Sequence, residues 1–222
     1  MIKQMKVGNL KQDETIYPRV KLNWFHVAEM VEALESGKKL PPLVADKATK
    51  KVIDGWHRIE ALKKYWKLGN DTQVEVDLRE YVNEAEMFTD SIRLNASHGQ
   101  GFSPSDRLST IVKAEKLELT IDTVASLLNI TLDKATSMKQ ERLGTFNLKP
   151  IILKSTMGHL AGHDLTEEQS QFTHKAGGMN QTFYINQVIG LVVSDSLDWN
   201  NEKVMNAIRK LFELLSGKLL VK

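Results

Sequence analysis

Apolar and polar residues alternate with two different periods along the N-terminal part of the chain, which predicts a mixture of helices and strands. Helical spacing follows Asn23, whose side chain can cap the helix, and it returns over residues 56–68. Residues 43–45 and 51–54 are short β candidates joined by a polar connection of hairpin length, and residues 74–78 alternate as a half-buried strand does. We therefore expect this region to combine helices with a small sheet.

The strand pattern stops near Asn83, and helices separated by short polar turns are expected from there to about residue 145. Ser103 followed by Pro104 is a strong helix start, because serine caps and proline at the first helical position loses no hydrogen bond. Two short helices at 121–128 and 132–142 are separated by a tight turn. Their spacing is that of a helix-turn-helix.

These patterns predict an α+β chain in three parts. Residues 1–100 form a small mixed α/β domain, residues 101–148 an all-helical region with the helix-turn-helix, and residues 149–222 a helical C-terminal region. The last helix carries an apolar stripe that includes Leu211 and Leu215. We expect this stripe to pack against the chain itself or to form a homodimer.

Composition narrows the function classes. The 222 residues include 30 Lys+Arg and 28 Asp+Glu, which gives a net charge of +2. This charge alone does not indicate nucleic-acid binding. No cysteine is present, which excludes disulfides, thiolate metal sites and cysteine nucleophiles. No run of roughly 18 apolar residues occurs, so we expect a cytoplasmic protein with no membrane partner.

The junction between the second short strand and the next helix is the most informative position. A strand that leads directly into a helix exposes unpaired N–H groups at the positive end of the helix dipole, which attracts anions. Gly55 permits close approach of the backbone, Arg58 and His57 offer donors, and Asp54 can orient His57 or hold a metal-bound water. The alternative is a surface turn in which Asp-Gly only reverses the chain and Arg58 is solvated.

The run 54–62, with the segment 40–44 before it, resembles the ParB/sulfiredoxin fold. In ParB partition proteins the equivalent turn binds the phosphates of CTP, and in sulfiredoxins a related turn binds those of ATP. Gly55, Arg58 and Ala61 match both patterns. The resemblance therefore implies that a nucleoside triphosphate, CTP or ATP, binds here with Mg²⁺.

Two positions of this turn differ from one or both of the ParB and sulfiredoxin patterns. Trp56 stands where sulfiredoxins have their cysteine, which excludes sulfinic-acid reduction, and it also stands where ParB has a glutamate. His57 matches the sulfiredoxin pattern and replaces the first arginine of the ParB turn. The nucleotide-binding set implied at this turn is Gly55, Trp56, His57 and Arg58.

A second segment, residues 93–99, resembles the part of ParB that closes over the triphosphate. On that resemblance Asn95 and His98 contact the nucleotide. The alternative for His98 is a loop histidine without a role.

The helices after Ser103 resemble the helix-turn-helix module that ParB-like and KorB-like proteins carry directly after the nucleotide-binding region. Small Ala125 lets its two helices cross closely. The second helix offers hydroxyl and basic groups for phosphates and base edges, which predicts DNA contacts from one set of residues. These are Thr131, Lys134, Ser137, Lys139 and Arg142. The alternative is a helical bundle with a solvated polar face.

The preferred hypothesis is a ParB-like DNA-binding protein, of the partition or transcription-regulator type, that binds a nucleotide at residues 55–58. The first alternative is an enzyme, a ParB-like nuclease or a nucleotide-dependent phosphotransferase, with Asp54, His57 and Glu60 as metal ligands and general base. The second is a degenerate scaffold without a ligand. His159 and His163 have metal-ligand spacing, but no third ligand is evident, so no metal site is predicted.

Overall fold

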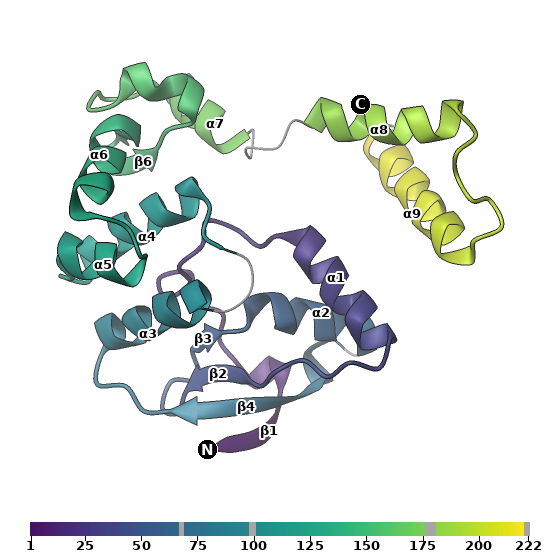
Figure 1. Ribbon diagram of the computed structural model, residues 1–222, viewed down its shortest axis with the longest axis horizontal. Helices are drawn as coiled ribbons and strands as arrows, with labels where there is room; N and C mark the ends of the chain where they lie inside the picture. Colours follow the sequence, from purple (N-terminus) through teal and green to yellow (C-terminus); the bar gives the residue numbers. More distant parts are fainter. Residues whose placement is uncertain (67–68, 98–100, 176–180, 220–222) are drawn as a thin grey trace. The chain divides into compact units, whose positions relative to one another are not determined.

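A computed structural model of the chain describes residues 1–66, 69–97, 101–175 and 181–219 (Figure 1). The described chain divides into two compact units, residues 1–175 and 176–222. The mixed α+β class expected from the sequence is confirmed. The domain boundaries at residues 100 and 148 stay predictions.

A four-stranded sheet with the order β1-β4-β2-β3 lies in the first unit (Figure 1). β2 runs parallel to β4, whereas β1 pairs antiparallel with β4 and β3 antiparallel with β2. The strands are β1 (Ile2–Lys6), β2 (Leu43–Asp46), β3 (Val52–Asp54) and β4 (Gln73–Arg79). The sequence pattern does not predict β1, because its apolar residues Ile2 and Met5 lie three positions apart and break the period of two.

Helices cover both faces of this sheet. Leu43 and Ala45 of β2 pack in one cluster with Ile59 of α2 (Trp56–Trp66). Val44, which points to the opposite face, packs with Met87 of α3 (Glu84–Ser97). All four residues of β2 are consequently buried, and α1 (Trp24–Glu35) packs against α2. α1 therefore lies beside α2, and α3 beside β3.

The expected helices follow, and each has a side-chain cap at its N-terminus. They are α4 (Pro104–Lys116), α5 (Ile121–Leu127) and α6 (Leu132–Arg142). Ser103 and Asp106 form a reciprocal capping box, while Thr120 and Thr131 cap the two later helices. Buried Val124, Ala125 and Ala135 join α5 and α6 in one core with residues of α3 and α4.

A β-hairpin follows α6 without a linker, in a region where only helices are expected from the sequence. Its strands are β5 (Leu143–Phe146) and β6 (Lys149–Ile152). Four-residue strands with one glycine and one proline give no usable period, which is why the pattern does not reveal them. The hairpin packs over a small core of Leu153, Met157 and Leu165.

The segment after the hairpin holds a 3-10 helix (Ser155–Leu160) and α7 (Glu167–Lys175). His159 lies in the 3-10 helix and His163 beyond its end, so the two do not share one α-helical face. Among the residues that the structure describes, no group of three or more His, Asp or Glu could hold a metal ion.

In the second unit, the described residues 181–219 form two helices, α8 (Gln181–Val193) and α9 (Glu202–Leu219). Over residues 184–218 no side chain is buried, and large apolar side chains on both helices are exposed. In the described part of the chain, no helix combines the length and the apolar character that crossing a bilayer requires.

Candidate functional site

The junction between β3 and α2 is built on Gly55. Its backbone has φ +113°, and a Cβ at this position would collide with the side chain of Leu43 and lie 3.2 Å from the Nε of Arg58. Any other residue would therefore be strained here. The Ile59 N–H bonds to the Gly55 carbonyl at 2.9 Å, so the amides of residues 56–58 precede the first intrahelical bond. These amides have the geometry of an anion site at a helix N-terminus.

A cavity of about 470 Å³ opens beside this turn. Its lining comes from the segment before α1, from α1, from the β3–α2 turn and from α3. The lining residues are Tyr17, Arg19, His26, Met30, Pro41, Ile53, Asp54, Gly55, Trp56, His57, Arg58 and Asn95. The fold thus brings together five of the residues implied for nucleotide binding: Gly55, Trp56, His57, Arg58 and Asn95. His98 lies outside the described residues.

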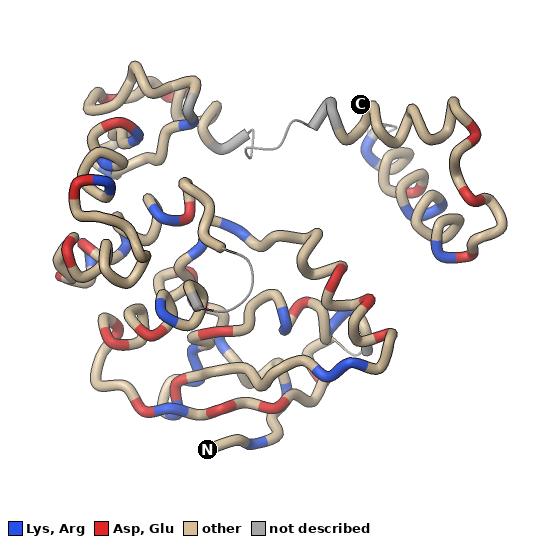
Figure 2. The backbone as a smooth tube through the Cα atoms, in the orientation of Figure 1, with Lys and Arg blue, Asp and Glu red and all other residues tan. Residues whose placement is uncertain are grey.

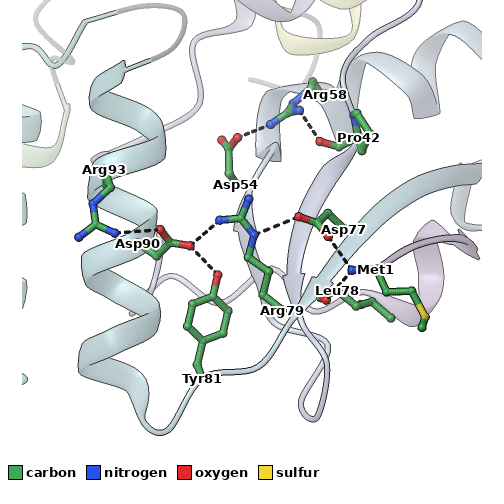
Figure 3. Close-up of polar contacts among 10 residues, drawn as sticks. All are labelled: Met1, Pro42, Asp54, Arg58, Asp77, Leu78, Arg79, Tyr81, Asp90 and Arg93. Atoms are coloured by element: carbon green, nitrogen blue, oxygen red, sulfur yellow. Dashed lines mark hydrogen bonds and ion pairs between the residues drawn. The ribbon is translucent and has the colours of Figure 1, made fainter.

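Arg58 is held by three oxygen atoms, of which Figure 3 shows those of Asp54 and Pro42. Its guanidinium forms an ion pair with the Asp54 carboxylate and donates to the carbonyls of Pro41 at 3.0 Å and Pro42 at 2.6 Å. A cation such as Arg58 in the first turn of a helix lies beside the positive end of the helix dipole, which is unfavourable. The Asp54 carboxylate balances this charge, and the sequence pattern does not indicate that pairing. The same ion pair occupies the carboxylate that could have oriented His57.

Burial and neighbouring cations keep His57 neutral. Its Nε2 accepts a hydrogen bond from the Asn23 backbone N–H at 3.0 Å, and the His26 ring lies edge-on with the ring centroids 5.4 Å apart. Desolvation lowers the His57 pKa to about 4, and the nearby Arg19, His26 and Arg58 act in the same direction, whereas Asp106 opposes them. A neutral ring whose acceptor nitrogen is already bonded is poorly suited to act as a general base.

Trp56 is part of the cavity wall and of the hydrophobic core at once. Its ring stacks on Tyr17 with centroids 4.1 Å apart and planes 7° from parallel, and both side chains are almost fully buried. The Trp56 Nε1 and the Tyr17 hydroxyl have no hydrogen-bond partner among the described residues. The stack therefore supplies shape and apolar surface. No periodicity or motif in the sequence indicates Tyr17.

Arg19 is the second cavity residue that sequence reasoning does not find. It is 6% exposed, and its guanidinium bonds to the Asn95 Oδ1 at 3.5 Å and to the Gly101 carbonyl at 3.3 Å. It also lies 3.8 Å from the Asp106 carboxylate and 4.9 Å from the centre of the Phe102 ring. Arg19 therefore brings a buried positive charge to the cavity and connects α3 with the start of α4.

Glu60 does not line the cavity. Its carboxylate accepts a hydrogen bond from Lys63 at 3.1 Å one turn further along α2. Its role in the enzyme alternative stays a prediction without geometric support.

The five residues expected to contact DNA lie on α6 or at its cap, where acidic and basic positions are interspersed along the backbone (Figure 2). Thr131 caps the helix by accepting from the Lys134 amide at 3.2 Å. Lys134 is exposed and Ser137 half-buried. Lys139 is paired with Glu115 of α4, and the Arg142 Nε and Nη2 donate to the Leu153 carbonyl at 2.9 and 2.8 Å.

Comparison with known proteins returns no matching protein-family model and no matching curated protein. Among solved structures, the chain is similar to the C-terminally truncated ParB of Caulobacter crescentus. For the complex with CTP-gamma-S, identity is 16%, coverage is 63% of this chain and 78% of that one, and the TM-score is 0.38. For the complex with the centromeric parS site these values are 16%, 64%, 73% and 0.43. A Pnob8-like ParB-N domain aligns at 18% identity over 68% of this chain and 56% of that one, with a TM-score of 0.41. All three are ParB structures, the family that the sequence resembles.

His57 makes the stability of the fold depend on pH. The unfolded chain protonates this side chain near pH 6.5 and the folded chain only near pH 4, so between these values the unfolded state binds more protons. Acidification through this window should lower the free energy of unfolding by on the order of 3 kcal/mol, most of which His57→Gln should remove. Urea unfolding at a series of pH values measures this.

His163→Gln is the matched control, because that histidine is exposed. It should keep the pH dependence of the unaltered chain. A His57→Gln variant whose stability falls as steeply as that of the unaltered chain would contradict the assignment.

Proposed function

We propose that the chain is a ParB-like DNA-binding protein whose cavity takes a nucleoside triphosphate, CTP or ATP. The observation that carries this proposal is the cavity itself. Residues 56–58, whose amides precede the first intrahelical bond, line it together with Arg19 and Asn95. Amides at a helix start together with guanidinium groups favour phosphate oxygens.

Mg²⁺ fits this site only as part of a nucleotide complex. Asp54 is the one carboxylate among the described residues that line the cavity, and Arg58 already holds it. The phosphate oxygens would therefore supply most of the ligands of the ion. The same ion pair and the bonded Nε2 of His57 favour a binding site over the nuclease or phosphotransferase alternative.

Titration of CTP, ATP and GTP with Mg²⁺ by calorimetry tests the nucleotide. Arg58→Gln should weaken binding about 10- to 100-fold, because it removes a charge-assisted contact to phosphate. Asp54→Asn should strengthen binding, because it removes the carboxylate that competes for Arg58. In an enzyme that needs the Asp54 carboxylate, the same change would instead abolish turnover.

Arg209→Gln is the control, since Arg209 is an exposed arginine of α9 that does not line the cavity. It should bind as the unaltered chain does. No heat with any of the three nucleotides would refute the proposal.

The DNA-binding part of the proposal rests on α5, α6 and the turn between them. Residues 131–134 at the start of α6 are exposed, while Ala135 and Met138 are buried, so one face of the helix is available over its first turn. An exposed lysine at a helix start is suited to a phosphate at the edge of the major groove.

Lys134→Ala should weaken binding to double-stranded DNA and make the slope of log K against log salt shallower by about 0.9, the value for one phosphate contact. Fluorescence anisotropy at several salt concentrations measures both quantities. Lys116→Ala, an exposed lysine at the end of α4, is the control. Equal slopes for the two variants would remove Lys134 from the interface.

The second unit is proposed to form a homodimer. α8 and α9 expose Ile185, Ile189, Phe212 and Leu215, and no side chain in the described part of this unit is buried. Two helices without a core of their own are stabilised when a second copy covers their apolar faces.

Light scattering should give about twice the 25.1 kDa chain mass for the unaltered protein. Ile189→Asp should shift the mass toward the monomer, whereas Gln187→Asp, an exposed polar neighbour on α8, should not. A monomer at micromolar concentration would contradict the proposal.

A further inference from the structure

The turn of the β5–β6 hairpin has a backbone conformation that does not suit its sequence. Phe146 pairs with Lys149, so only Asn147 and Leu148 connect the strands. Both have positive φ, 50° and 62°. Asparagine adopts this conformation readily, whereas the second position of such a turn normally takes glycine and disfavours a residue with a branched side chain.

The strain at Leu148 is not offset by packing of its side chain. Its side chain is 97% exposed, the highest value among the exposed large apolar residues of the described chain. A strained backbone position that presents an uncovered apolar side chain is not explained by packing within the chain. It points to a contact outside the chain.

The base of the hairpin is fixed to the end of α6. The Leu153 N–H bonds to the Arg142 carbonyl at 2.8 Å, and the Arg142 guanidinium bonds back to the Leu153 carbonyl. On the outer edge of β5, Thr145 exchanges backbone bonds with His163 at 3.0 Å and Leu165 at 2.7 Å. The hairpin is therefore tied to the end of α6 through both of its strands.

The reach of the hairpin matches the dimensions of a DNA groove. At about 3.3 Å per residue, the four residues of β5 place the turn about 13 Å from the end of α6. The major groove of DNA is about 12 Å wide. When a helix lies in that groove, a tip at this distance reaches the neighbouring phosphate strand and the edge of the minor groove.

The charge around the hairpin suits a polyanion. From residue 142 to residue 163 the sequence has three cations, Arg142, Lys149 and Lys154, and no Asp or Glu. The Asp164 carboxylate accepts a hydrogen bond from the Thr145 hydroxyl of β5, and Lys154 donates to the Phe172 carbonyl, so the cation at the tip is Lys149. Lys149 is exposed and directly follows Leu148. A flanking lysine for phosphate beside an apolar side chain for sugar and base edges is a combination used at the minor groove.

We propose that the hairpin tip, residues 147–149, is a second DNA contact beside α6. Leu148 lies against the sugars and base edges of the minor groove, and Lys149 neutralises one phosphate. The proposal rests on DNA binding by α6 and adds a contact that the helix-turn-helix alone does not make.

Leu148→Gly separates this role from a structural one. Glycine suits the turn, so the variant should be at least as resistant to thermal unfolding as the unaltered chain, yet bind double-stranded DNA about tenfold more weakly through loss of one leucine contact. Lys149→Gln should make the salt slope shallower by about 0.9. The affinity and the salt slope are measured by anisotropy on the full chain with a labelled duplex of mixed sequence.

The controls are Val82→Gly, a 90% exposed apolar residue outside the hairpin, and Lys38→Gln, an exposed lysine after α1. Neither should change affinity or slope. If Lys134→Ala weakens binding while both hairpin variants bind as the unaltered chain does, the hairpin contact is refuted and binding by α6 stands. If the unaltered chain does not bind the duplex, both fail.

Discussion

The ion pair between Asp54 and Arg58, formed across the Gly55 turn, holds the junction of β3 and α2 and determines how available Arg58 is to an anion. Asp54 ends β3 and Arg58 lies in the first turn of α2, so the pair fixes the angle at which the strand enters the helix. Both side chains are more than three-quarters buried, and removing one partner of such a pair is typically costly because the other charge stays desolvated. An anion that enters the cavity therefore competes with Asp54 for Arg58.

The cavity and the helical region share one segment of the chain. Tyr17 and Arg19 line the cavity, and two side chains of α4 hold the backbone of this segment. Lys113 Nζ donates to the Tyr17 carbonyl at 2.7 Å, and Thr110 Oγ1 donates to the Pro18 carbonyl at 2.8 Å. Burial lowers the Lys113 pKa, which is consistent with an ammonium group largely removed from water. Residues 17–19 therefore contribute to the cavity wall and also contact α4.

Local signals account for what the sequence predicts well. The caps at Asn23 and Ser103 and the alternation over residues 74–78 are encoded within a few positions, and the structure has these elements. The contacts of the site are not local. Arg19 meets Asn95 across 76 positions of sequence, and the hairpin after α6 is too short to show a period. The residue types around Gly55 could be found from sequence, whereas their partners depend on how distant elements pack.

Hydrogen–deuterium exchange at the amides of residues 56–58 tests the central claim, that the start of α2 binds phosphate, most directly. Addition of a triphosphate with Mg²⁺ should slow exchange at these amides, because the phosphate oxygens become their acceptors. Saturating nucleotide that leaves their exchange rates unchanged would contradict the account.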